Sequence, residues 1–177
     1  MKTKSVIVAS ALSLSLLSSE LYAAPAASVQ KKQPVISTVT DTAANIKVVK
    51  RFINEVLNSG HAEIIDQVWA NDMIWHGGSM GEIHGLDNFK KLNGGKAFSN
   101  LHLKIKDVIA SGDKVVIYFT NSGTQTGDFM GFHSAGKTAS WDGMGIYRIQ
   151  NGKIAEGWFS EDILQMLIQL EAIKLPK

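Results

Sequence analysis

The segment from residue 151 to residue 170 constrains the fold of this chain more than any other part of it. It opens with Asn151-Gly152 between two strand-like runs, and an Asn-Gly pair favours a type I′ turn, in which both central residues take positive φ. The two runs are therefore expected to pair as a β-hairpin. After the second run, Ser160 is placed to cap a helix that is almost entirely apolar from Ile163 to Leu170. Such a helix must be covered by another part of the fold, and Asp162 is expected in its first turn.

Helical periodicity dominates the region before the first hairpin. Apolar residues recur at spacings of three and four between Ile46 and Leu57, Thr40 or Asp41 can cap this helix, and Gly60 ends it. The other elements expected in this region are a short helix carrying residues 64–69, a strand at 72–76 and a helical segment at 85–92.

From Leu101 onward the hydrophobic period changes to two, which is typical of half-buried strands. Ser111-Gly112-Asp113 provides a turn in front of the next strand. The strands expected after that turn are 114–126, 138–150 and 154–159. Helices first, then a run of antiparallel strands and one closing helix indicate an α+β domain.

The N-terminal residues are not expected to belong to this domain. Lys2 and Lys4 precede an uncharged apolar stretch that ends at Leu21-Tyr22-Ala23, which is the pattern of a secretory signal peptide over residues 1–23. Residues 24–40 mix small, polar and Pro residues without periodicity and are expected to be a flexible linker. The domain itself is expected over 41–173, in a protein that is exported to the periplasm or secreted.

Composition narrows the range of partners. The chain has no cysteine, so the core alone must stabilise an exported fold, and a thiol nucleophile is excluded. Loss of Lys2, Lys4 and Glu20 with the signal peptide changes the formal net charge from +2 to +1. A charge so close to neutral gives no reason to expect nucleic acid or, after signal removal, a membrane as partner.

Several runs together resemble the SnoaL-like polyketide and ester cyclases of the nuclear transport factor two-like superfamily. The similarity extends over roughly residues 45–172. It is carried by the first helix (48–60), Asp72-Met73-Ile74-Trp75-His76, Gly123-Thr124-Gln125-Thr126-Gly127, the run 130–137, and Gly152-Lys153-Ile154 followed by Trp158, Asp162 and Gln169-Leu170. The resemblance implies a cone: a strongly bent antiparallel sheet, N-terminal helices that close its concave face around a pocket, and a short C-terminal helix.

Asp162 is the first candidate for a catalytic residue. The resemblance implies that the acidic residue at this position acts as general acid/base in a bond-forming or isomerising step. The alternative is structural, because a carboxylate at a helix N-terminus is stabilised by the macrodipole by about 0.3–1 kcal/mol. Enclosure in an apolar pocket would favour the catalytic interpretation. The adjacent Glu161 is expected to be a solvated charge.

His76 is the second catalytic candidate, because it shares strand parity with Ile74 and could face the same cavity. A hydrogen-bonded histidine of the core or pocket rim is the alternative. On the strand 138–150, Asp142 shares a face with Met144, so it either lines the cavity or forms the polar end of the strand. The residues expected to bind substrate are Trp75, Tyr118, Met130, Asp142, Met144 and Trp158, although aromatic and Met residues also form ordinary cores.

One departure from the family concerns Gly143 and Gly145, which stand where characterised polyketide cyclases carry polar side chains, and it puts a polyketide substrate in doubt. No His, Asp or Glu spacing resembles a zinc motif, and no glycine-rich nucleotide loop is present in the sequence, so no metal and no cofactor are expected.

These observations lead to a protein that binds a small apolar or carbonyl-bearing molecule. If it is an enzyme, it is a cyclase, isomerase or lyase that uses acid–base catalysis for aldol cyclisation, isomerisation or dehydration. The alternatives are a non-catalytic binding protein and a homodimeric interaction module that uses the exposed sheet face and the apolar helix 161–170.

Overall fold

The computed structural model of the chain describes residues 41–92, 97–133 and 136–176. The chain divides into Met1–Ile36 and Ser37–Lys177, and every described residue belongs to the second unit. The expected signal peptide and linker lie outside the described residues. Among the helices that are described, none is both long and apolar enough to cross a membrane.

The first helix begins as predicted. Asp41 is the N-cap of α1 (Thr42–Arg51), and its carboxylate accepts a hydrogen bond from the Ala44 backbone N–H at 3.0 Å. The helix continues as a π-helix, η1 (Phe52–Asn58), and the chain leaves it through Gly60 at φ 74°. The short helices that follow are η2 (Ala62–Ile64), α2 (Ile65–Val68), η3 (Gly78–Met80) and α3 (Leu86–Lys91).

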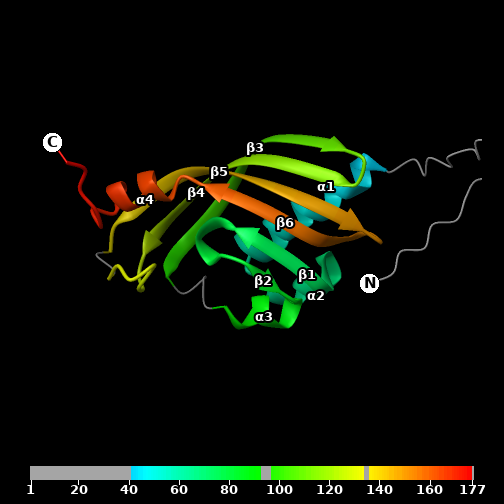
Figure 1. The fold of residues 1–177 in the computed structure, drawn as a ribbon, viewed down its shortest axis with the longest axis horizontal. Helices are drawn as coiled ribbons and strands as arrows, with labels where there is room; N and C mark the ends of the chain where they lie inside the picture. Colours follow the sequence, from blue (N-terminus) through cyan, green and yellow to red (C-terminus); the bar gives the residue numbers. More distant parts are fainter. Residues whose placement is uncertain (1–40, 93–96, 134–135, 177) are drawn as a thin grey trace, which may run out of the picture. The chain divides into compact units, whose positions relative to one another are not determined.

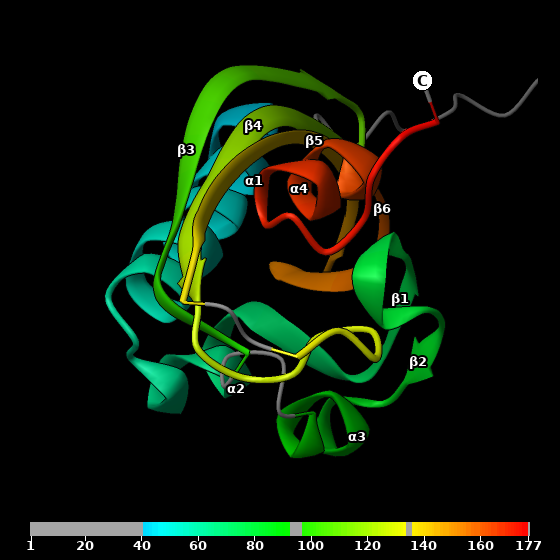
Figure 2. The same cartoon turned by 90° about the vertical axis from the view of Figure 1, so that its left-hand side faces the viewer.

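The strands form one six-stranded curved sheet in the order β2-β1-β6-β5-β4-β3 (Figures 1 and 2). The sheet was expected to be antiparallel, but β1 pairs with β6 in parallel. No hairpin joins these two strands, so their relative direction could not be obtained from a local turn. The strands are β1 (Trp69–Gly77), β2 (Ile83–His84), β3 (Phe98–Ser111), β4 (Lys114–Gln125), β5 (Thr138–Gln150) and β6 (Lys153–Glu161).

The hairpin at Asn151-Gly152 is confirmed, with φ values of 52° and 73°. The strand after it is longer than predicted. Ser160 and Glu161 stay paired with Met144 and Gly143 of β5, so the chain remains extended up to Glu161. For this reason Asp162, not Ser160, is the N-cap of α4 (Ile163–Gln169).

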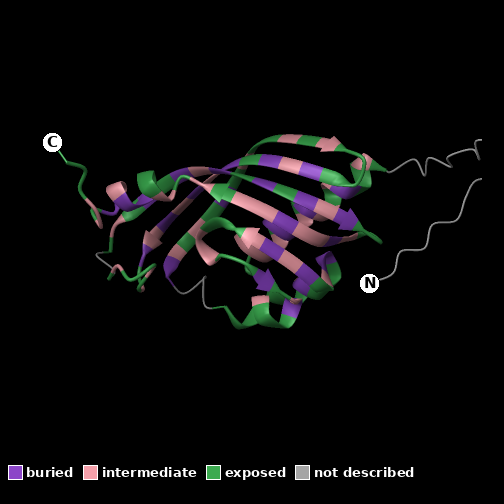
Figure 3. Ribbon diagram, viewed as in Figure 1, coloured by how far each residue is buried: buried purple, intermediate pink, exposed green. Residues whose placement is uncertain are grey.

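Helices cover the inner, concave face of the sheet at its two ends (Figure 2). At one end α1 and η1 place Val49, Phe52 and Ile53 in a large apolar cluster with β1, β4, β5 and β6. At the other end α4 contributes Met166 and Leu167 to a smaller cluster that includes Trp141. The helices that belong to these two clusters leave the opposite, outer face uncovered. Along β4 and β5, buried inward residues alternate with more exposed outward ones (Figure 3).

Glycines on the inner face make room for aromatic rings. A Cβ built on Gly143 would lie 2.6 Å from the Phe119 ring, and one on Gly157 would lie 2.7 Å from the Phe159 ring. Phe159 in turn stacks on Trp75, with ring centroids 3.5 Å apart. A Cβ on Gly145 would lie 3.1 Å from the Phe159 ring, so Gly143 and Gly145, the two departures from the family pattern, both serve packing.

Replacing Gly143 by Ala is expected to destabilise the fold by about 1–3 kcal/mol, because the buried Phe119 ring and the Ser160 carbonyl, 3.1 Å from the new Cβ, must both move. Gly123→Ala is the matched control, since Gly123 also lies within a strand and its nearest neighbours are 3.4 Å away. That control should be neutral or stabilising by up to about 1 kcal/mol. Urea denaturation measures both; equal losses in the two variants would contradict the packing explanation.

Candidate functional site

The structure places five of the predicted site residues on the outer face of the sheet, and none of these five on the inner face; they are His76, Tyr118, Asp142, Met144 and Trp158. On β5, Trp141, Gly143, Gly145 and Tyr147 face inward, whereas Asp142 and Met144 lie on the outer face. The grouping of these residues by strand parity was correct, but the expectation that Asp142 and Met144 line the interior is not met. Periodicity separates the two faces of a strand without showing which one is covered.

Asp162 is exposed at the start of α4. Its carboxylate accepts a hydrogen bond from the Gln165 backbone N–H at 3.0 Å, as an N-cap does. Asp162 is therefore not enclosed in an apolar pocket, as a catalytic role was expected to require. The reason is the longer strand: β6 stays paired through Glu161, and Asp162 is the residue at which the chain turns into the helix.

His76 lies on the outer face of β1, stacked on Trp158 with ring centroids 5.3 Å apart. Both ring nitrogens face carboxylates: Nε2 lies 2.9 Å from Glu156 and Nδ1 lies 3.2 Å from Glu82. The hydrogen bond to Glu156, together with the Glu82 contact, raises the pKa of His76, although desolvation opposes the shift. Arg148 also binds Glu156, at 2.9 Å. With both nitrogens engaged, His76 connects β1 to β6 and to the segment before β2.

Asp142 is the centre of a second outer cluster. Its carboxylate accepts hydrogen bonds from Lys106 at 2.8 and 2.9 Å, Tyr118 at 2.6 Å and Thr120 at 2.7 Å. Lys106 first, then Tyr118 and Thr120, hold the pKa of Asp142 far below its usual value. A carboxylate kept ionised by three donors is poorly suited to giving up or taking a proton.

Of the remaining predicted residues, Trp75 and Met130 lie apart from the outer face. Trp75 is buried in the large apolar cluster, and its indole N–H donates to the Gly77 carbonyl at 3.1 Å. Met130 is 57% exposed, in the segment between β4 and β5. Tyr118 and Trp158 belong to the outer face with Asp142 and His76.

The inner face carries a carboxylate that the sequence analysis assigned to solvent. Gly157, Phe159 and Glu161 occupy every second position of β6, so their side chains lie on the same face of the strand. Its Oε1 accepts hydrogen bonds from Asn121 Nδ2 at 2.8 Å and from Trp141 Nε1 at 3.1 Å. Both donors are buried, so they hold the carboxylate in a fixed position.

Glu161 lies where the two apolar clusters meet. Trp141, one of its donors, belongs to the smaller cluster, whereas the preceding inward residue, Phe159, packs against the larger one. A Cβ on Gly78 would be 3.1 Å from Glu161 Oε2, so the loop after β1 also approaches this carboxylate. Desolvation, and secondly the charge of Glu161, raise the pKa of the buried Tyr147 phenol, so that phenol stays protonated.

The sequence of β4 contains a pattern that could have predicted the polar group around Glu161 on the inner face. Asn121 and Gln125 continue the buried face that begins with Val115 and Ile117, and polar residues on a buried face require partners. The Gln125 side chain donates to the carbonyls of Gly127 and Phe132, each at 3.1 Å. The polar part of the inner face is thus connected to the segment after β4.

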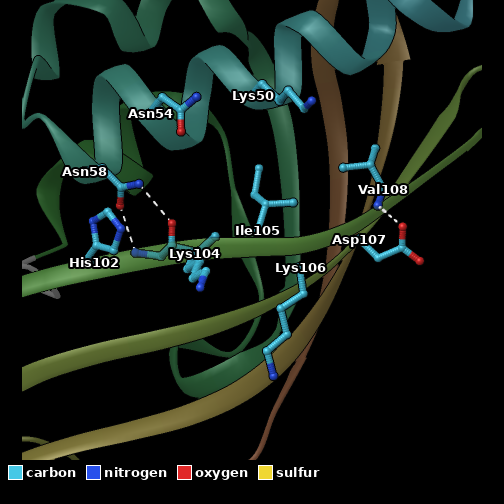
Figure 4. A pocket seen from close by; sticks show the side chains of 10 residues that line it. Lys50, Asn54, Asn58, His102, Lys104, Ile105, Lys106, Asp107 and Val108 are labelled. Carbon is cyan, nitrogen blue, oxygen red and sulfur yellow. Dashed lines mark hydrogen bonds between the residues drawn. The ribbon is translucent and has the colours of Figure 1, made fainter.

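An open depression of about 610 Å³ lies elsewhere, between β3 and the helical segment formed by α1 and η1 (Figure 4). Lys50, Asn54 and Asn58 line it on the helical side and residues 102–108 on the strand side. Asn58 accepts from the Leu103 N–H at 2.8 Å and donates to the Leu103 carbonyl at 2.9 Å. None of the predicted site residues borders this depression. Within 41–92, 97–133 and 136–176, no three His, Asp or Glu side chains are arranged to hold a metal ion.

His76→Gln should lower the free energy of unfolding by about 0.5–1 kcal/mol in mildly acidic solution, because it removes the charged link to Glu156 and Glu82. A raised histidine pKa stabilises the fold below its unfolded value of about 6.5, and this stabilisation is lost as the pH rises through the folded value. The difference between wild type and variant should therefore shrink between about pH 5.5 and pH 9 in urea denaturation.

His133→Gln is the control for this prediction, since His133 is 90% exposed and pairs only with Asp128 among the described residues. It should leave the unfolding free energy nearly unchanged. A His76→Gln difference that grows toward alkaline pH would contradict the assigned role.

Comparisons with known proteins agree with this fold. The sequence pattern of the SnoaL-like polyketide cyclases matches residues 47–170. TsrD from Streptomyces laurentii is similar in structure with a TM-score of 0.67 at 24% identity, over 75% of this chain and 98% of that one. A protein from Jannaschia sp. CCS1 assigned to the SnoaL-like polyketide cyclases has a TM-score of 0.68 at 19% identity, over 82% and 99%.

AclR from Streptomyces galilaeus, described as a candidate hydroxylase, has a TM-score of 0.65 at 26% identity, over 75% of this chain and 99% of that one. No curated protein matches the chain significantly in sequence. The family pattern spans most of the domain, from α1 to the end of α4, and the solved structures share the curved sheet with its covering helices. The chain belongs to the SnoaL-like polyketide cyclase family.

Proposed function

We propose that this protein binds a small apolar or carbonyl-bearing molecule on the inner face of the sheet and catalyses proton transfer on it. The observation that carries this proposal is Glu161, a carboxylate on the inner face held by two buried donors, Asn121 and Trp141. Family membership supports a cyclase-type reaction. Aldol-type cyclisation, isomerisation and dehydration all require such a group and no covalent intermediate with the protein.

The chemistry assigned to Glu161 follows from its two oxygens. Oε1 is engaged by Asn121 and Trp141, whereas Oε2 accepts no hydrogen bond from any described residue. In the proposed reaction Oε2 takes a proton from the carbon beside a carbonyl, and the C–H electron pair forms an enolate. The enolate carbon attacks a second carbonyl, whose oxygen then receives the proton. Phe159, the preceding inward residue of β6, is only partly buried and supplies apolar surface beside Glu161 for such a substrate.

Asp162, the residue implicated by family resemblance, is the second candidate for this role. Its exposure and its capping hydrogen bond favour Glu161. A non-catalytic binding protein is the alternative function, in which Glu161 orients a bound ligand without exchanging a proton.

The pattern of residues 1–23 supports the further proposal that the protein acts in the periplasm or outside the cell. A substrate for it would then have to be present in that compartment.

Glu161→Gln should reduce proton exchange at the α-carbon of an aryl β-keto ester in D2O by at least about 100-fold, because the amide cannot accept the proton. The exchange rate is followed by proton NMR. Gln keeps the size of the side chain and an oxygen that can accept the two hydrogen bonds.

Asp162→Asn is the matched variant, since Asn is as good an N-cap as Asp and should preserve α4. It is expected to retain wild-type exchange. Loss of activity in Asp162→Asn with retention in Glu161→Gln would assign the acid/base to Asp162. Quenching of Trp fluorescence by the same ester, without exchange in any form of the protein, would favour the binding protein.

A further inference from the structure

The depression between β3 and the helical segment of α1 and η1 has no part in the proposed reaction. Its volume is about 610 Å³, and side chains of both walls surround it (Figure 4). One wall is an edge of the sheet, because β3 is the last strand in the strand order. An edge strand presents backbone N–H and C=O groups that no neighbouring strand binds. The depression is therefore lined by backbone groups that can form hydrogen bonds.

The strand register identifies the backbone groups of β3 that face this edge. In an antiparallel pair, every second residue directs its N–H and C=O away from the partner strand. Leu103 is such a residue, since the Asn58 side chain binds both of its backbone groups. Ile105, two positions further, therefore directs its N–H to the same edge. After the register shift that follows Ile105, Val108 faces the edge, and its N–H donates to the Asp107 carboxylate at 2.8 Å.

The N–H of Ile105 lies between two edge groups that already have partners. Side chains bind the N–H groups of Leu103 and Val108, whereas that of Ile105 has no partner among the residues that the structure describes. On the opposite wall, Asn54 precedes Asn58 by four residues and lines the same depression (Figure 4). The Asn54 amide also makes no hydrogen bond with a described residue. Two unused donors thus lie on facing walls.

The change from α-helix to π-helix keeps the polar side chains of the helical wall in line. Lys50, Asn54 and Asn58 are spaced by four residues, and the helix changes type between Arg51 and Phe52. Four residues exceed one turn of an α-helix but fall short of one turn of a π-helix, so the two deviations oppose each other. All three side chains therefore border the depression. π-helical turns are rare and are frequent at functional sites.

The depression carries an excess of positive charge. Lys50 and Lys104 border it, and neither forms an ion pair with a described carboxylate. Asp107 is the acidic residue of the lining, and its carboxylate binds a backbone N–H. Lys106, which also borders the depression, is paired with Asp142 on the outer face. Two ammonium groups without carboxylate partners therefore accompany the two unused neutral donors.

We propose that this depression binds a small organic carboxylate. A carboxylate has two acceptor oxygens, so it can bind the Ile105 N–H on the strand and the Asn54 amide on the helix at the same time. Lys50 and Lys104 supply the opposite charge. Ile105 and Val108 are only partly buried, so they leave hydrocarbon surface for an apolar part of the same ligand. An aryl or branched aliphatic carboxylate combines these properties.

Titration of the full chain with 4-fluorobenzoate, followed by fluorine NMR, tests the proposal. Saturable binding is expected, and 4-fluorobenzamide, which has a similar shape without the charge, should bind at least about 10-fold more weakly. Asn54→Ala should raise the dissociation constant of 4-fluorobenzoate by about 10-fold, and Lys50→Gln by about threefold, because an exposed ion pair contributes less. Both side chains are exposed, so both variants should fold; far-UV circular dichroism checks this.

Lys47→Gln is the matched control, since Lys47 is also exposed on α1 but does not border the depression. It removes the same charge and should leave the dissociation constant unchanged. Absence of saturable binding, equal affinity for the amide and the carboxylate, or binding that Asn54→Ala does not weaken would overturn the proposal. The site lies on η1 and β3, whereas Glu161 lies on β6, so none of these results bears on the proton exchange expected for Glu161.

Discussion

The register between β5 and β6 is the constraint on which the rest of this structure depends. A shift of one residue would exchange the two faces of β6, because the side chains of a strand alternate. In the observed register, Gly145 and Gly157 leave space for the Phe159 ring, and Gly143 for the Phe119 ring. The same register directs Glu161 inward and leaves Met144 and Ile146 outside. The packed core and the candidate site are therefore consequences of one strand pairing.

Charged side chains have different kinds of partner on the outer and inner faces of the sheet. Outside, His76, Glu156, Asp142 and Lys106 neutralise one another in short-range ion pairs and contribute to holding strands together. Inside, Glu161 has no cationic partner among the described residues and is held by two neutral donors. The absence of a cationic partner distinguishes Glu161 from Asp142 and Glu156, and its place on the inner face distinguishes it from the exposed Asp162.

Local signals predicted much of the fold. The Asp41 cap, the end of the first helix at Gly60, the full extent of β5 and the Asn151-Gly152 turn all depend on residues close in sequence, and all are confirmed. The parallel pairing of β1 with β6 is between segments far apart along the chain, and no local pattern specifies it. The end of β6 was misplaced because Ser160 is a good capping residue, whereas its pairing with Met144 outweighs that preference. Because β6 ends two residues later than predicted, the carboxylate on the inner face belongs to Glu161, and Asp162 caps the helix instead.

The hydrogen bonds of Asn58 have a consequence for the behaviour of the protein at high concentration. β3 is an edge strand, and an edge presents free backbone groups on which strands of other molecules can add. At Leu103 both of these groups are occupied by the Asn58 amide, which imitates the backbone of a neighbouring strand. A strand of another molecule cannot pair with β3 at Leu103 while Asn58 holds these groups, so one route to fibrous aggregation is blocked. The chain has no cysteine, so this protection depends on hydrogen bonds and not on disulfides.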